Sequence, residues 1–85
     1  MKKMYDGYAW IRVKVTIPEA WKRFTLRLAG GPVDDADWTY FNGVKIGETT
    51  LDKVPNAHAV KRNYRIPPEL IRFGRENTLT IRVYD

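Results

Sequence analysis

The residues best suited to chemistry in this sequence are three carboxylates that lie close together, Asp34, Asp35 and Asp37. Oxygen clusters of this kind can hold calcium, which takes roughly six to eight oxygen ligands. A short Asp-rich segment can instead cap backbone N–H groups, or Asp35 or Asp37 can pair with a buried arginine such as Arg62 or Arg82. The spacing is not that of an EF-hand loop. We expect no metal or cofactor, and the three aspartates are the candidate ligands if a structural calcium ion is bound.

The sequence lacks the side chains of the common nucleophilic mechanisms. It has no cysteine and no serine, and its one histidine is His58, which we expect to be a surface residue. A Ser-His-Asp arrangement is therefore impossible. Retaining glycosidases need two carboxyl groups about 5–5.5 Å apart on facing elements, whereas most acidic residues here fall in predicted turns. A pair such as Asp35 and Asp37 remains to be considered, and we expect that the chain is not an enzyme by itself.

Aromatic residues suggest a different chemistry, the binding of carbohydrate. The C–H faces of sugar rings pack on Trp and Tyr, and sugar hydroxyls need a few polar partners. Trp38 and Tyr40 are two positions apart and so share one face of a strand, and Trp10 is a candidate for the same face. With Asn42 as the polar partner, these are the predicted ligand-binding residues. The alternative is that the tryptophans fill the core and that Asn42 only shapes a turn.

The formal charge of +5 and the pI near 9.7 permit contact with phosphate or another anionic surface. The basic residues are spread along the strands rather than clustered, which favours a solvated outer face. Nucleic acid is the alternative partner, because basic residues alternate with Trp10, Tyr40 and Tyr84. No nucleic-acid-binding signature is present, so we do not expect that partner. No apolar run is long enough for a leader or a membrane span, and we expect no contact with a membrane.

Alternating apolar residues predict about six short strands at 10–17, 24–28, 38–41, 44–46, 60–66 and 78–84. Short helical turns are expected at 18–21 and 67–71, and loops at 29–32 and 48–58. The fold class is therefore all-β, an antiparallel sandwich in a single domain over 1–85, with 1–6 as a flexible N-terminus. The chain has no cysteine, so no disulfide reinforces so small a core.

The pattern also predicts which side chains point inward. The expected core comprises Ile11, Val13, Val15, Ile17, Phe24, Leu26, Leu28, Tyr64, Ile66, Leu79, Ile81 and Val83. Trp21 and Leu70 are expected to close the ends of the sandwich. Asn42-Gly43 predicts a two-residue hairpin turn, which needs positive φ at both positions.

Several segments resemble one known family. They are GYAW at 7–10, VDDADWTYFNGVKIG at 33–47, YRIPPEL at 64–70 and GRENTLTIRVYD at 74–85. Together they resemble the non-catalytic, galactose-binding-like jelly-roll domain of glycoside hydrolase family 2 enzymes, and most closely the version in sialate O-acetylesterase-like enzymes. The resemblance covers nearly the whole chain, from about Gly7 to Asp85.

The resemblance implies an accessory, carbohydrate-binding-like module that packs against an adjacent catalytic domain. In some family 2 galactosidases the asparagine of the matching turn reaches the neighbouring active site, so the resemblance implies a substrate contact for Asn42. The full family domain is longer and has at least eight strands, whereas about six are predicted here. Missing strands leave sheet edges unpaired, and such edges favour association with another chain. A homodimer through these edges, and a structural or engineered sandwich without a ligand, are the alternatives.

Overall fold

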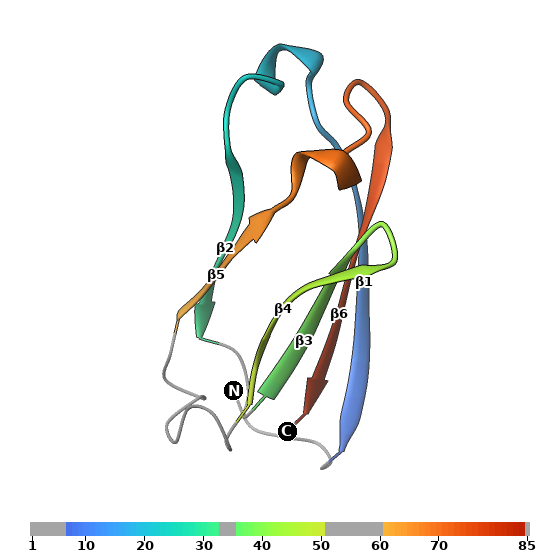
Figure 1. The fold of residues 1–85 in the computed structure, drawn as a ribbon. Helices are drawn as coiled ribbons and strands as arrows, with labels where there is room; N and C mark the ends of the chain where they lie inside the picture. Colours follow the sequence, from blue (N-terminus) through green and yellow to red (C-terminus); the bar gives the residue numbers. More distant parts are fainter. Residues whose placement is uncertain (1–6, 33–35, 51–60, 85) are drawn as a thin grey trace.

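The computed structural model describes residues 7–32, 36–50 and 61–84, which form two antiparallel β-sheets that face each other (Figure 1). The larger sheet has the strand order β1 (Tyr8–Thr16), β6 (Glu76–Tyr84), β3 (Ala36–Phe41) and β4 (Val44–Thr49). The smaller sheet pairs β2 (Leu26–Pro32) with β5 (Lys61–Ile66). The predicted all-β sandwich is confirmed. The predicted flexible segment 1–6 and His58 lie outside the described residues.

Two short turns of 3-10 helix, η1 (Glu19–Trp21) and η3 (Pro68–Leu70), lie where helical turns were expected. A proline precedes each turn, and in η3 Pro68 also takes the first helical position, where its fixed φ is suitable and its missing N–H leaves no unpaired donor. No helix among the described residues is long and apolar enough to cross a membrane.

The β3–β4 hairpin forms as the sequence predicts. Asn42 and Gly43 adopt φ of 48° and 86°, and such positive values at both central positions give a turn whose twist matches the two strands. β4 continues to Thr49, beyond the predicted end at 46. The pairing shifts between Thr39 and Tyr40, so β4 contains a bulge opposite this point.

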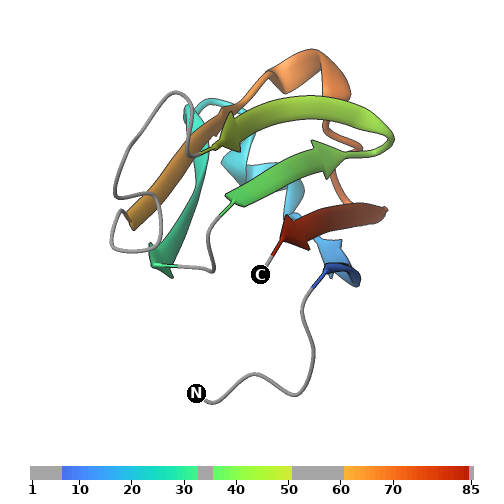
Figure 2. The ribbon, with the colours of Figure 1, turned by 90° about the horizontal axis from the view of Figure 1, so that it is seen from below.

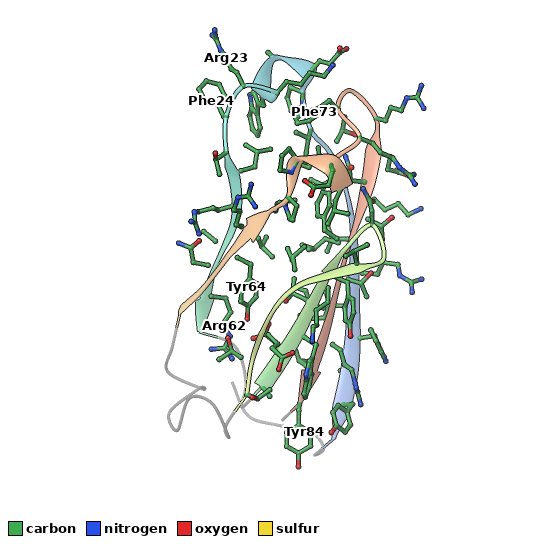
Figure 3. All side chains as sticks on the ribbon, in the orientation of Figure 1. Arg23, Phe24, Arg62, Tyr64, Phe73 and Tyr84 are labelled. Carbon is green, nitrogen blue, oxygen red and sulfur yellow. The ribbon has the colours of Figure 1, made fainter. Side chains whose placement is uncertain are left out.

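Predictions for β2 were wrong at both of its ends. The expected loop at 29–32 is strand, because it pairs with β5 from Ala29 opposite Asn63 to Pro32 opposite Lys61. This pairing overrides the low strand propensity of glycine and proline, with an irregularity between Gly30 and Pro32. Phe24 precedes the strand and is 56% exposed, with the Arg23 guanidinium 5.6 Å from the centre of its ring (Figure 3).

The core between the two sheets is centred on Ile17, Phe41 and Ile66, which are buried. Leu26, Leu28, Leu70 and Leu79 are among the partly buried residues that pack against these three, as the sequence predicts. Viewed along the sandwich, β5 lies beside β4, and β1 is at the far edge of the larger sheet (Figure 2).

The inner face of β1 is the main correction to the predicted core. Ile11, Val13 and Val15 point to the inner face as expected, yet they are 45%, 46% and 37% exposed. The described smaller sheet has only two strands, which is too narrow to cover all four strands of the other. An apolar groove of about 220 Å³ therefore runs between β1 and β2. Trp21, expected to close the core, lines this groove and is 48% exposed.

Gly47 in β4 is required by the packing of Tyr64 from β5. A Cβ atom built at Gly47 would lie 2.2 Å from Cδ1 of the Tyr64 ring. The ring therefore lies directly on the backbone of β4, and this contact joins the two sheets on the side opposite the groove.

Gly47→Ala should lower the free energy of unfolding by about 1–3 kcal/mol, because the added methyl group forces the Tyr64 ring to move. Urea unfolding followed by circular dichroism measures this difference. The control is the same substitution in a Tyr64→Ala background, where the obstructing ring is gone and the loss should fall below about 0.5 kcal/mol. Equal losses in both backgrounds would show that the ring is not the cause.

Candidate functional site

The outer face of the larger sheet carries a cluster of aromatic side chains. Alternate residues of β1, β6 and β3 point away from the core, and the strand register places Trp10, Arg82 and Trp38 in one row. We call this cluster the aromatic platform. It consists of Tyr8, Trp10, Trp38, Tyr40 and Tyr84, with Arg82 at its centre.

Arg82 holds the platform together. Its guanidinium carbon lies 4.0 Å from the ring centroid of Tyr8, 5.1 Å from that of Trp38 and 5.9 Å from that of Trp10. These are distances at which the positive charge is attracted to the negative faces of the rings. The guanidinium thus holds side chains from two strands, on either side of β6, in one arrangement.

The rings also contact one another. The Tyr8 centroid is 4.9 Å from that of Tyr84 and 6.0 Å from that of Trp38, and Trp10 and Tyr40 are 6.3 Å apart. All three pairs are tilted, which is a favourable geometry for aromatic rings. Tyr8 is 53% and Trp10 61% exposed, so this ordered surface is open to solvent.

Three of the four predicted ligand-binding residues, Trp10, Trp38 and Tyr40, share this face as the sequence analysis expected. Tyr8, Tyr84 and Arg82 belong to the same face and were not among the predicted ligand-binding residues. The sequence does contain the signal for them, because Tyr8 is two positions before Trp10 and Arg82 is two positions before Tyr84. What it could not give is the order β1-β6-β3, which places these strands side by side.

Asn42, the fourth predicted residue, directs its amide into the protein. Its Nδ2 donates hydrogen bonds to the carbonyl oxygen of Leu70 (2.7 Å) and to Oδ1 of Asn77 (2.9 Å). Its Oδ1 accepts a hydrogen bond from the backbone N–H of Thr78 (2.8 Å). Both amide hydrogens are therefore used within the fold. The structure gives Asn42 a structural role at the edge of the face.

Asn77 is the partner that fixes this end of the face. Its side chain is fully buried, with 0% exposure. Its Oδ1 accepts from the backbone N–H of Arg72, and its Nδ2 donates to the carbonyl oxygens of Val15, Arg72 and Arg75 at 3.0–3.3 Å. One amide thus connects β1, the hairpin turn and the segment before β6.

A buried ion pair connects β3 of the larger sheet to β5 of the smaller sheet. Asp37 and Arg62 are 1% and 4% exposed, and Arg62 Nε donates to Asp37 Oδ1 at 2.5 Å (Figure 3). The hydroxyl groups of Thr39 and Tyr64 each donate to Asp37 Oδ2 at 2.9 Å. Because the single Tyr64 proton goes to Asp37, the Thr49 hydroxyl must donate to Tyr64 at 2.7 Å. Of the pairings considered from the sequence, the structure shows that of Asp37 with Arg62, whereas Arg82 packs against the aromatic rings of the outer face.

The same network bears on the candidate calcium ligands Asp34, Asp35 and Asp37. The carboxylate of Asp37 is occupied by Arg62, Thr39 and Tyr64, an environment that already neutralises its charge. Asp34 and Asp35 lie outside the described residues. Within the described part of the chain, no three His, Asp or Glu side chains are grouped as metal ligands.

Solved structures with the same fold occur among β-glucuronidases. The β-D-glucuronidase of Dictyoglomus thermophilum matches 94% of this chain with a TM-score of 0.81 and 21% sequence identity. The Ruminococcus gnavus β-glucuronidase matches 95% with a TM-score of 0.82 and 17% identity. At these identities the likeness establishes the fold. No protein-family model and no curated protein sequence matches the chain.

This chain corresponds to only a small part of those enzymes. The matched region covers 13% of each of the two β-glucuronidase chains. The fold found here is therefore that of a small β domain that occurs within longer glycoside hydrolase chains. The sequence resemblance to a domain of such enzymes and the structural likeness agree at this level.

Tyr64→Phe should lower stability by about 1 kcal/mol at neutral pH, because one hydrogen bond to the buried Asp37 carboxylate is lost. Burial raises the pKa of Tyr64 from 10.0 to about 12, and the hydrogen bond to Asp37 adds to this effect. The folded state thus holds the phenol proton more tightly than the unfolded state does. The protonated Tyr64 phenol therefore stabilises the folded state fully below pH 10, and this stabilisation is lost as the pH rises through about 12.

The measurement is urea unfolding of both proteins at several pH values. The stability difference between them should shrink between pH 10 and 12, and absorbance at 295 nm should show one late-titrating tyrosine that Tyr64→Phe lacks. A difference that does not depend on pH would mean that the phenol proton plays no part.

Proposed function

We propose that this chain is a non-catalytic accessory domain of a carbohydrate-active enzyme and that its aromatic platform binds carbohydrate. The observation that carries the proposal is the platform itself, five aromatic side chains held around Arg82 on an exposed face. Aromatic side chains in a soluble domain normally go to the core. Ordered, open rings on one face are what a ligand with flat apolar surfaces needs.

Carbohydrate fits this face better than a purely apolar ligand does. A sugar ring has C–H faces that stack on Trp10 and Tyr40, and hydroxyl groups that need polar partners at the edge of the stack. Arg82 offers guanidinium N–H groups, and the Thr80 hydroxyl lies between Arg12 and Tyr40 in the strand register. The platform therefore combines stacking surface with hydrogen-bonding groups at short range.

The fold supports the assignment to a carbohydrate-active enzyme. Similar folds form a small part of β-glucuronidases, and the sequence resembles a domain of family 2 glycoside hydrolases and sialate O-acetylesterase-like enzymes. In such an arrangement the catalytic residues belong to a neighbouring domain. This chain would place its platform beside the substrate path and add binding energy away from the reacting bond.

The neighbouring domain would pack on the inner face of β1. Ile11, Val13 and Val15 form an exposed apolar strip there, beside the groove and Trp21. A strip of this kind on a monomer marks a contact surface. An adjoining domain is the partner that we assign to it, because the similar folds are embedded in longer chains. The homodimer considered from the sequence would instead use unpaired sheet edges, such as that of β1.

Trp10→Ala should weaken carbohydrate binding about tenfold or more, because it removes the most exposed ring of the platform. The measurement is titration with xylo-, cello-, galacto- and uronic-acid oligosaccharides, followed by ¹⁵N chemical shifts and isothermal calorimetry. Trp21→Ala is the matched control, since Trp21 is also an exposed tryptophan but lies at the groove. Equal losses in both variants, or shifts confined to the groove, would contradict the proposal.

Val13→Thr should change the stability of the isolated chain by less than about 0.5 kcal/mol, because Val13 is 46% exposed there. Val83→Thr places the same hydroxyl at a buried position and should cost about 1–3 kcal/mol. Similar losses in the two variants would mean that Val13 is covered in solution. Light scattering would then show whether a second copy covers it, through a doubled mass.

A further inference from the structure

A basic hollow adjoins the aromatic platform on the same outer face. Its volume is about 440 Å³, and it lies beside the Asn42-Gly43 turn. Its lining comprises Arg12, Lys14, Asn42, Gly43, Arg72, Thr78 and Thr80. Three cationic side chains and two hydroxyl groups thus surround one depression.

The strand register explains why these groups meet. Arg12 lies opposite Thr80 and Lys14 opposite Thr78 across the β1–β6 pair, with all four on the outer face. The third cation, Arg72, belongs to the segment between η3 and β6, whose backbone is held by the buried amide of Asn77. The hollow is therefore built from fixed backbone, although its charged groups are exposed.

The charge in the hollow is largely uncompensated. Among the described residues, the one ion pair at its edge joins Lys14 to Glu76 at 3.4 Å, and both side chains are well exposed. Arg12 and Arg72 form no ion pair with any residue that the structure describes. A site with two unpaired guanidinium groups and two hydroxyl donors favours an anionic group such as a carboxylate or a sulfate.

The hollow and the platform are continuous. Arg12 is two positions after Trp10 on β1, and Thr80 lies between Arg12 on one side and Tyr40 on the other. A ligand that stacks on Trp10 and Tyr40 therefore has its next group beside Arg12. Arg12, Lys14 and Arg72 gather at this one end of the face, and Arg82 lies within the platform. Nucleic acid is instead bound along a positively charged groove that follows the backbone.

We infer that the platform and the hollow together bind an acidic saccharide. One sugar ring stacks on Trp10 and Tyr40, and its carboxylate or sulfate enters the hollow between Arg12 and Arg72. This inference rests on the proposed function and adds the ligand class, which is an anionic rather than a neutral glycan.

The test compares acidic oligosaccharides with neutral versions of the same molecules. The probes are oligogalacturonate and hyaluronan oligosaccharides, each beside its carboxyl-reduced form, and a heparin-derived oligosaccharide beside its desulfated form. At least one acidic member should bind about tenfold tighter than its neutral counterpart, with the difference reduced at 0.5 M salt. The heparin pair distinguishes sulfate from carboxylate recognition.

Arg12→Gln and Arg72→Gln should each remove most of this preference, since both groups contact the anion. Arg27→Gln is the matched control, because Arg27 lies on the smaller sheet and should leave all affinities unchanged. Chemical shift changes at Thr78 and Thr80 would place the ligand in the hollow.

Equal affinity for the acidic and neutral members would overturn this inference and leave the proposed function standing. Binding of none of the saccharides would overturn both. A single-stranded DNA oligonucleotide of fifteen thymidines serves as the final probe. If it binds on this face and the acidic saccharides do not, the face is a nucleic-acid site and the inference is wrong.

Discussion

The buried amide of Asn77 is the interaction on which much of this structure depends. It lies in a domain with little core, at the place where β1, the hairpin turn and the segment before β6 meet. An unsatisfied buried donor or acceptor costs about 1–3 kcal/mol, a large fraction of the stability of so small a domain. By bonding to Val15, Arg72 and Asn42, this one side chain removes several such costs. The edge strand, the hollow and the hairpin turn are all positioned by it.

At the other end of the sandwich, the ion pair of Asp37 and Arg62 has a similar role. Burial of two charges is costly unless their remaining hydrogen-bonding positions are filled. Thr39 and Tyr64 fill those of the carboxylate, and the Tyr64 ring rests on the backbone at Gly47. The two sheets are thus joined by a polar contact where apolar packing ends. Asp37 and Asn77 are buried side chains of β3 and β6, two of the strands whose outer face carries the aromatic platform.

Strand β1 links the two proposed surfaces. Because its side chains alternate, Trp10 and Arg12 point to the outer face, and Val13 and Val15 point to the groove. Both faces are open, since β1 is an edge strand beyond the reach of the described two-stranded sheet. The proposed accessory role would use this arrangement, with one face for the ligand and the other for the domain that carries the catalytic groups. A domain whose sheets were equal in width would bury the second face.

The sequence by itself determined the local structure and its periodicity. Alternation along 10–17 and 78–84 gave the strands and the direction of each side chain, and Asn42-Gly43 gave the hairpin, because these depend on neighbouring residues alone. The same alternation placed Trp38 and Tyr40 on one face. It also gave the candidate pairing of Asp37 with Arg62, although not the reason why that pair is buried.

Only the tertiary structure decided which of these faces are covered and which strands lie side by side. The alternation along 10–17 predicts that Val13 is a core residue, and it is exposed because the opposing sheet is too narrow. The segment 29–32 reads as a loop, and it is strand because β5 supplies the hydrogen-bond partners. The site itself follows from the order β1-β6-β3, which brings Trp10, Arg82 and Trp38 into one row. The order of the strands and the covering of one sheet by the other depend on contacts between residues far apart in the chain. The local pattern of apolar and polar residues does not reveal those contacts.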